Sequence, residues 1–364
     1  MTVLLFLIVL AALIFVHELG HFLTAKLFGI RVDEFAIGFP PKIVSWTKGE
    51  TRYALNLIPL GGYVKIFGED PDDESISGPD SKRSFVNAAK WKQIIVLLSG
   101  ILMNVVFAWL LISISFNLGS VTAITDQYKD NAKNVSVMIF SVLKNSPSEV
   151  AGLKEGDSIL EIDSGKTKIV SPNIIDIQNI VSKNKGIISI QYKRGIATGT
   201  ANVIAQDGVV EGRKAIGISM GLVGTVKFNF FRSFIEGAKL TANEVVNITK
   251  GIYSFIWGAI TGKGDVFSQV TGPVGIAGMV GQASGLGLSY LFGFIAMISI
   301  NLAMLNLVPF PALDGGRILF VLIEIVIRKK IKPAIANWIN MIGFGLLIAL
   351  MLFITYKDIL RLFH

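Results

Sequence analysis

Two histidines and a glutamate near the start of the chain have the spacing of a zinc-binding helix. His17, Glu18 and His21 match the pattern H-E-x-x-H. On a helix, residues four apart share a face, so both imidazoles can bind one Zn²⁺ while the glutamate faces the open coordination position. The alternative is two surface or core histidines that are four residues apart by chance.

The surroundings of the two histidines argue against chance. Residues 1–16 contain no charged side chain, and the apolar run continues to Ala25 around them. About 20 apolar residues cross a bilayer core, and an unpaired ionisable group there costs roughly 3 kcal/mol. A bound metal would offset that cost. A signal peptide fits poorly, because no Lys or Arg precedes the run and no small-residue cleavage site follows it.

The composition of the whole chain indicates a membrane protein. Of the 364 residues, 52% are hydrophobic and 16% are charged, whereas soluble proteins have about 25% charged residues. There is no cysteine, so any metal site must use histidine, carboxylate or backbone oxygen. The net charge of +8 does not indicate nucleic-acid binding, because no recognition motif accompanies it and cytoplasmic loops of membrane proteins are basic.

Hydropathy and charge divide the chain into four membrane spans and the segments between them. Residues 51–66 alternate polar and apolar side chains around a Pro/Gly cluster, which predicts a β-hairpin. The predicted layout is a transmembrane helix at 1–28, a cytoplasmic loop at 29–92 with the hairpin at 51–66, a transmembrane helix at 93–118, a soluble domain at 119–227, an amphipathic helix and glycine-rich segment at 228–287, a transmembrane helix at 288–316, a cytoplasmic loop at 317–333 and a transmembrane helix at 334–357.

Basic residues set the orientation in the membrane. Lys and Arg gather between the first and second spans and between the third and fourth, and cytoplasmic loops carry such an excess. We therefore expect an inner (plasma) membrane protein whose termini and soluble domain are external. The active site then lies near the cytoplasmic side.

A third metal ligand is required, because catalytic zinc usually takes three protein ligands and a water. Asp314 is the best candidate, at the end of the third span and on the same predicted membrane face as His21. Pro309 and Pro311 prevent regular helix just before it and leave the backbone free to turn the carboxylate inward. The alternative is that Asp314 caps the helix that follows.

Taken together, these residues resemble the site-2 protease family of intramembrane zinc metalloproteases, in the bacterial branch of the regulator-of-sigma-E protease. The family pairs H-E-x-x-H with N-x-x-P-x-P-x-L-D-G, and both patterns are complete here. Three further segments resemble family elements: 61–65 (its membrane-associated hairpin), Gly100 with Asn104 (its G-x-x-x-N element, with Ile101 where proline is common) and 272–276 (the segment before its third core helix).

The resemblance implies a role for each matching residue. His17, His21 and Asp314 would bind zinc, and Glu18 would be the general base. Asn306, the asparagine of the second pattern, would hold the substrate carbonyl or stabilise the oxyanion; its alternative is a buried interhelical hydrogen bond. The ligand set suits zinc and does not by itself separate zinc from iron or cobalt.

The implied substrate is a transmembrane segment of a single-span protein, cut in regulated intramembrane proteolysis. In the family, an anti-sigma factor or a signal-peptide remnant fills this role. A helical substrate must unwind locally before cleavage, and adding it as a strand to the hairpin would satisfy its backbone. The hairpin residues to test are Tyr53, Leu55, Leu57, Tyr63 and Val64. A purely structural hairpin is the alternative.

Residues 146–163 of the soluble insert resemble the core of a PDZ domain, of which one copy is evident. The strand at 137–142 is a candidate to receive a peptide, and a size filter against bulky substrates is another interpretation. The expected fold is thus a polytopic α-helical membrane protein with four transmembrane helices, a membrane-associated β-hairpin and an inserted PDZ-like α+β domain.

Two other classes of function compete with the protease. A non-catalytic membrane adaptor would use the PDZ-like domain to tether partners, but it would not need an intact metal site. A metal transporter would use His17, His21 and Asp314 as its transport site, but it would leave Glu18 without a role. Transporters also usually contain inverted repeats, and the sequence shows none.

Overall fold

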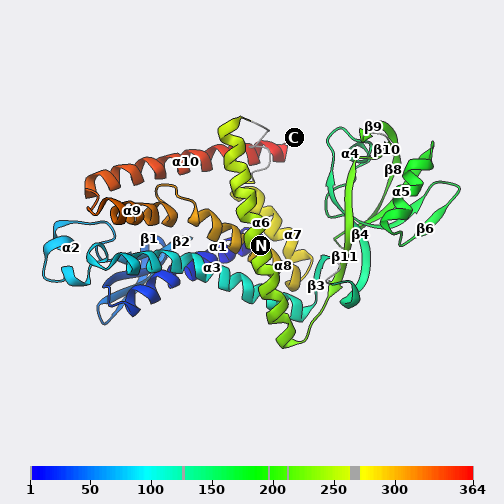
Figure 1. Ribbon diagram of the computed structural model, residues 1–364. Coiled ribbons are helices and arrows are strands. Elements are labelled where there is room, and N and C mark those ends of the chain that lie inside the picture. The colour runs from blue at the N-terminus through cyan, green and yellow to red at the C-terminus, as the bar shows by residue number, and fades with distance from the viewer. Residues whose placement is uncertain (1, 125–127, 196, 211–212, 263–270, 364) are drawn as a thin grey trace. The chain divides into compact units, whose positions relative to one another are not determined.

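The computed structural model describes residues 2–124, 128–195, 197–210, 213–262 and 271–363 (Figure 1). The chain forms two compact units. The first contains residues 1–113, 234–283 and 292–364, and the second contains residues 114–233 and 284–291. The two are described separately below.

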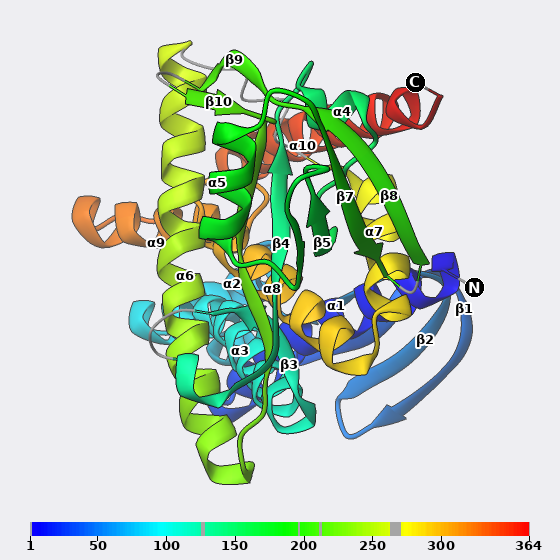
Figure 2. The ribbon, with the colours of Figure 1, turned by 90° about the vertical axis from the view of Figure 1, so that its right-hand side faces the viewer.

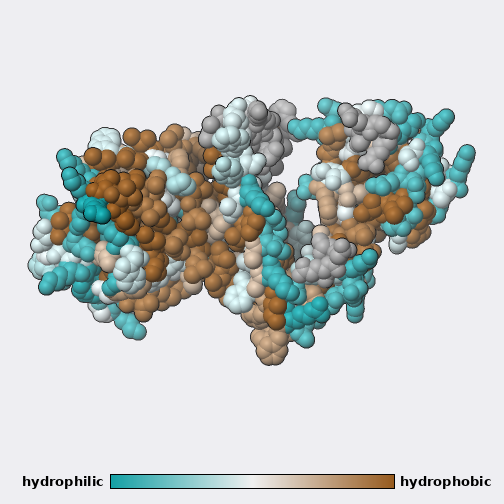
Figure 3. Space-filling view, in the orientation of Figure 1, coloured by the Kyte–Doolittle hydropathy of each residue, from teal (hydrophilic) through white to brown (hydrophobic). Residues whose placement is uncertain are grey.

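Four helices are long and apolar enough to cross a membrane, as the hydropathy predicts: α1 (Thr2–Leu27), α3 (Lys90–Leu118), α8 (Leu288–Leu307) and α10 (Pro333–Phe363). Their apolar side chains remain largely exposed. In α10, only 6% of the most apolar 18-residue stretch is buried. Figure 3 shows hydrophobic surface over much of the first unit, including α9 (Asp314–Ile327) and α10. An exposed apolar surface of this extent requires lipid as its solvent.

Three further helices are α2 (Asp73–Ser77), α6 (Phe230–Thr261) and α7 (Pro273–Gly285). The predicted segment 228–287 thus contains two helices, and its residues 263–270 lie outside the described residues. The segment 317–333, predicted as a cytoplasmic loop, contains most of α9, which continues to Ile327. No helix breaker occurs between Arg317 and Ile327, and the helix ends where Arg328 takes a left-handed backbone conformation, with φ of 52°.

The prediction of a hairpin within residues 51–66 is wrong. Residues Thr51–Ile66 form one strand, β2, which pairs with β1 (Val32–Lys48), and the turn between them is at Gly49 and Glu50. Phe35 of β1 lies opposite both Val64 and Tyr53. The two halves of β2 therefore lie on either side of the first part of β1 and do not pair with each other.

A turn was predicted at residues 59–62 because a Pro/Gly cluster is typical of hairpin turns. In the structure its glycines allow close approach instead. A Cβ on Gly62 would lie 2.7 Å from the carbonyl oxygen of Ala36. The partner strand β1 was not predicted, since adjacent prolines at 40 and 41 argue against a strand in sequence reasoning.

The second unit is built on a seven-stranded sheet. Six strands follow the order β3-β11-β4-β5-β7-β8, and β6 pairs with β5. The strands are β3 (Ser120–Ala123), β4 (Ala132–Val142), β5 (Ser158–Asp163), β6 (Lys168–Val170), β7 (Ile187–Arg194), β8 (Ala197–Ile204) and β11 (Ile218–Val226), and a separate two-stranded sheet joins β9 (Gln206–Val210) to β10 (Arg213–Ala215).

Two helices complete this unit: α4 (Pro147–Val150) and α5 (Ile174–Lys183). Figure 2 shows α5 beside the sheet, and Ile177, Ile180 and Val181 on it belong to the buried core. The strand at 137–142 lies inside the sheet: β11 pairs along its length, and β5 pairs with Val137 and Met138 on its other side. It is therefore not a fully open edge for an incoming peptide.

Candidate metal centre

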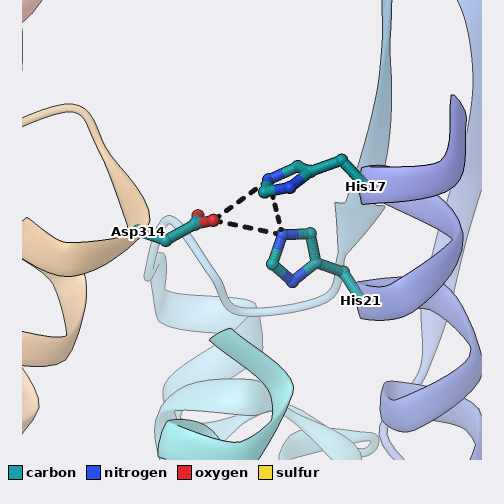
Figure 4. A group of neighbouring side chains, drawn as sticks. All are labelled: His17, His21 and Asp314. Carbon is teal, nitrogen blue, oxygen red and sulfur yellow. Dashed lines mark hydrogen bonds and ion pairs between the residues drawn. The ribbon is translucent and has the colours of Figure 1, made fainter. Parts of the chain in front are cut away.

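Three side chains from distant parts of the sequence converge at the centre of the first unit (Figure 4). His17 and His21 extend from the same face of α1, and Asp314 is the first residue of α9. Oδ2 of Asp314 lies 3.0 Å from Nε2 of His17 and 3.4 Å from Nε2 of His21. The two Nε2 atoms are 3.2 Å apart. Both imidazoles are buried.

This triangle fits a zinc ion. Two ligand atoms at about 2.0–2.1 Å from zinc and at the tetrahedral angle lie roughly 3.3 Å apart, close to all three separations. Asp314 Oδ2 is buried and accepts no hydrogen bond from the described residues. Two imidazole nitrogens and a carboxylate oxygen at this spacing can share one cation. The three groups therefore form a candidate ligand set for zinc.

The segment before α9 explains how Asp314 reaches the histidines. α8 ends at Leu307, ahead of Pro309 and Pro311, and helix resumes only at Asp314. Gly315 and Gly316 make the tight turn possible, because a Cβ on either would lie 2.2–2.3 Å from a carbonyl oxygen of Val308 or Phe310. The N-cap of α9 is Leu313, so Asp314 is not the cap residue.

The outer nitrogens of both histidines have partners on α3. His21 Nδ1 lies 2.8 Å from the carbonyl oxygen of Val96, and His17 Nδ1 lies 3.3 Å from the side-chain nitrogen of Asn104. Gly100 lies between these two partners, and a Cβ there would be 2.3 Å from His21 Nε2. The sequence indicates Gly100 and Asn104 only through their resemblance to a family element. The contact between His21 and the backbone carbonyl of Val96 cannot be predicted from residue types.

Glu18 lies beside the metal ligands. Its Oε2 accepts a hydrogen bond of 3.1 Å from the backbone N–H of Val64 in β2. Glu18, His17 and Asp314 line two cavities, of about 250 and 570 Å³. A carboxylate in this position can exchange a proton with water that occupies either cavity.

Asn306 faces the smaller cavity from α8. Its Nδ2 is 3.5 Å from His17 Nε2, so the amide is close to the open coordination position. The larger cavity contains a feature that the sequence did not reveal: Arg317, one turn after Asp314, donates to Glu69 beyond the end of β2. This ion pair joins the start of α9 to the segment that follows the sheet.

The strand residues predicted to receive substrate fall into two groups. Tyr53 and Leu55 are paired on both sides, with Phe35 and Ile37 of β1 and with Trp46 and Val44 further along it. Neither residue is at an edge, so this part of the prediction is wrong, and Leu57 belongs to the same half of β2. Tyr63 and Val64 pair only with β1 among the described residues, and their other edge faces Glu18.

Comparison with known proteins agrees with this geometry. Residues 5–350 match the model of "Peptidase family M50". The chain is 37% identical to "Putative zinc metalloprotease CPE1693" of Clostridium perfringens, over 97% of each chain. It is 34% identical to a similarly named protein of Clostridium acetobutylicum, over 95% of this chain and 94% of that one.

A third relative carries a more specific name. "Regulator of sigma-W protease RasP" of Bacillus subtilis is 29% identical over 100% of this chain and 99% of its own length. Together with the match of the family model across most of the sequence, these likenesses identify the enzyme class and its metal. The chain belongs to peptidase family M50, the site-2 protease family, and is an integral membrane metalloprotease that uses zinc.

Proposed function

We propose that the protein is an intramembrane zinc endopeptidase that hydrolyses peptide bonds in transmembrane segments of single-span proteins. One observation carries this proposal: two histidines and a glutamate of α1, a helix of membrane-spanning character, meet the carboxylate of Asp314 at the start of α9. Soluble substrates would have no access to a site enclosed by lipid-exposed helices, whereas a segment within the bilayer would.

In this proposal His17, His21 and Asp314 hold the zinc. Bound zinc polarises the scissile carbonyl and lowers the pKa of water toward 7. Glu18 takes a proton from the attacking water and passes it to the leaving amine. Asn306, beside the open position, donates from its amide to the carbonyl oxygen as negative charge develops there.

The substrate must be extended at the scissile bond, and the edge of β2 at residues 62–66 offers it a place. Residues 32–37 occupy the inner edge of this segment, and the outer edge is next to Glu18. A substrate strand paired there would have its backbone groups satisfied in the bilayer and its carbonyls close to the metal. The opposite strand, at 42–48, is remote from Glu18 in the pairing order.

The principal test uses purified protein and a model single-span substrate, with and without a zinc chelator. Glu18→Gln should reduce cleavage by about 10²- to 10⁴-fold while the zinc content stays at one ion per chain. Chelation should abolish cleavage, and zinc should restore it. Undiminished cleavage by Glu18→Gln, or by the metal-free protein, would refute the proposal.

Strand addition has its own test, with synthetic substrates that carry one N-methylated amide each. Because alternate residues of a strand direct their N–H groups to the same edge, methylation should block cleavage at every second position near the scissile bond. The positions between them should tolerate it. A block without this alternation would exclude pairing with residues 62–66.

We further propose that the second unit is a PDZ-like domain that limits access of proteins with bulky external domains. The sequence of residues 146–163 and a compact sheet with its own core support this. Replacing the unit by a short linker should accelerate cleavage of substrates with a large folded external domain. Substrates without such a domain should be cut at the original rate, and equal rates before and after replacement would eliminate the filter.

The proposed orientation places the termini and the PDZ-like unit outside the cell and the loop at 29–92 inside. The chain contains no cysteine, so single cysteines at Ser81 and Lys166 can be labelled from either side without background. We expect labelling of Lys166→Cys in intact cells and protection of Ser81→Cys. The proposed physiological substrate is an anti-sigma factor or a signal-peptide remnant, in keeping with the name of the Bacillus subtilis relative.

A further inference from the structure

If His17 and His21 bind zinc as proposed above, each ring must be held in the tautomer that directs a lone pair to the metal. A histidine that binds a metal through one ring nitrogen carries its proton on the other, and that N–H needs an acceptor. Here both Nε2 atoms face Asp314. Each Nδ1 must therefore be protonated and must donate outward.

For His21 the acceptor is clear. Its Nδ1 is 2.8 Å from the carbonyl oxygen of Val96, and a carbonyl can only accept. This contact fixes the proton on Nδ1 and leaves the lone pair of Nε2 for the metal. Because the acceptor is backbone, it does not depend on the residue type at position 96.

For His17 the partner is the side chain of Asn104. The amide nitrogen is 3.3 Å from His17 Nδ1, so two donors would face each other in the zinc-binding tautomer. The amide oxygen, by contrast, is buried and has no partner among the described residues. A 180° turn of the amide exchanges its oxygen and nitrogen, which have nearly the same shape. Only the turned amide lets His17 Nδ1 donate.

The backbone at Asn104 is well placed for this task. Asn104 is fully buried, and its carbonyl oxygen accepts a 2.8 Å hydrogen bond from Ser299 of α8. Val96, Gly100 and Asn104 are spaced by four and so share one face of α3. On that face one carbonyl and one amide hold the two outer nitrogens, and the glycine between them leaves room for both rings.

We infer that Asn104 is a positioning residue for the zinc ligand His17. Its side-chain oxygen accepts the Nδ1 proton, which fixes the tautomer and the ring orientation that direct Nε2 to the metal. The side chain does not contact the reacting atoms. Its effect is expected in zinc affinity first, and in the rate only through loss of zinc.

The test compares zinc dissociation constants, measured by chelator competition on the full chain in detergent. Asn104→Leu keeps the size but removes the acceptor, and zinc affinity should fall about 10- to 100-fold. Asn104→Asp keeps an acceptor and should retain affinity close to that of the wild type. Asn301→Leu is the matched control: within the part of the chain that the structure describes, its amide donates only to Met297 of its own helix, and its replacement should leave zinc affinity unchanged.

A spectroscopic measurement separates positioning from a general packing role. The chain has only three histidines, so ¹⁵N-histidine spectra can be assigned by single substitutions. The zinc-bound wild type should show protonated Nδ1 at both His17 and His21, and Asn104→Leu should change the signal of His17 alone. Wild-type zinc affinity in Asn104→Leu, or equal losses in the Leu and Asp variants, would overturn the inference.

His17→Ala distinguishes this failure from failure of the proposed ligand set. If His17→Ala binds zinc normally, the ligand assignment itself is wrong. If His17→Ala loses zinc but Asn104→Leu does not, the assignment stands and only the role of Asn104 is refuted.

Discussion

The two units bury polar side chains for different reasons. In the second unit the buried interior is largely apolar, and the fully buried carboxylate of Asp157 is held by Arg194 at 2.6 and 2.7 Å. In the first unit many apolar side chains of the long helices are exposed beside a buried apolar cluster, while His17, His21 and Asn104 are buried. The polar groups of the second unit hold its fold together, whereas those of the first assemble a site.

This difference follows from the solvent of each unit. In water, burial of apolar surface stabilises a domain, and a polar group in its interior must be hydrogen-bonded to avoid a loss of stability. In lipid, apolar burial between helices gives no such stabilisation, and polar groups between the helices make the specific contacts. A buried polar residue is therefore a stronger indication of function in the first unit than in the second.

The largest effect expected from this comparison is at Gly100. An added methyl group would lie 2.3 Å from His21 Nε2 and 2.9 Å from His17 Cε1, so both rings must move. A displacement of about 1 Å at a catalytic centre costs roughly 100-fold in rate, and Gly100→Ala should lose at least that much, together with zinc affinity. Cleavage assays and zinc titration on the purified variant measure both.

Gly278→Ala is the control for that experiment. Gly278 is also a helical glycine of the first unit, but no atom lies within 4 Å of the position of its missing Cβ. Alanine there should leave rate and zinc affinity unchanged and raise stability slightly. If both alanine variants behave alike, the crowding at Gly100 is not what sets the geometry of the site.

A smaller effect is expected in the second unit, on stability alone. Asp157→Ala removes a fully buried carboxylate that accepts from Arg194 and from the backbone N–H of Lys154. Loss of such charged hydrogen bonds should destabilise this unit by about 2–3 kcal/mol, as seen in denaturant unfolding. Zinc affinity should not change, and a parallel loss of zinc would show that the two units are not independent.

Asp207→Ala provides the surface comparison within the same unit. The Asp207 side chain is 80% exposed, and its Oδ2 lies 4.0 Å from Nζ of Lys214. An ion pair of this kind contributes less than about 0.5 kcal/mol. A loss as large as that of Asp157→Ala would contradict the distinction between buried and exposed pairs.

An effect much smaller than that of Asp157→Ala is expected at the turn between β1 and β2, where rules for soluble surfaces should hold even in the first unit. Arg83 and Lys26 donate to Glu50, which lowers the pKa of its carboxyl to about 2. Because the pKa of Glu50 is lower in the folded protein than its ordinary value of 4.5, the ionised carboxylate stabilises the fold at pH values above 4.5. This contribution is lost as the pH falls toward 2.

Glu50→Gln should therefore unfold more easily than the wild type at neutral pH, by about 0.5 kcal/mol, because solvent screens a pair that is one-third exposed. Thermal unfolding at a series of pH values should show this difference shrinking below pH 4.5. A difference that grows on acidification would assign the wrong sign to the interaction.

The spans and the metal-binding residue types were predictable from the sequence, because long apolar runs and the H-E-x-x-H spacing are local patterns. Asp314 was predicted to lie near His17 and His21 because both motifs are at ends of spans on the same predicted face of the membrane. The structure brings these side chains together. The resemblance to site-2 proteases is confirmed by the family match.

The sheet in the first unit could not be predicted in the same way. Phe35 pairs with two segments at once, and such a register depends on contacts between residues far apart in the chain. The contact between Val64 and Glu18 and the ion pair between Arg317 and Glu69 are likewise non-local. No periodicity within a single segment indicates them, and the Pro/Gly cluster at 59–62 pointed to a turn that is not there.

The distance along the chain between the two halves of the metal centre has a consequence for biosynthesis. His17 and His21 leave the ribosome early, but Asp314 emerges only after the membrane helices α1 and α3 and the whole second unit have been made. At about 5–20 residues per second, translation to residue 314 takes roughly 15–60 s. Throughout that interval the nascent chain lacks one of the three proposed ligands. Under the function proposed above, the enzyme would therefore stay inactive while its own helices are being inserted into the membrane.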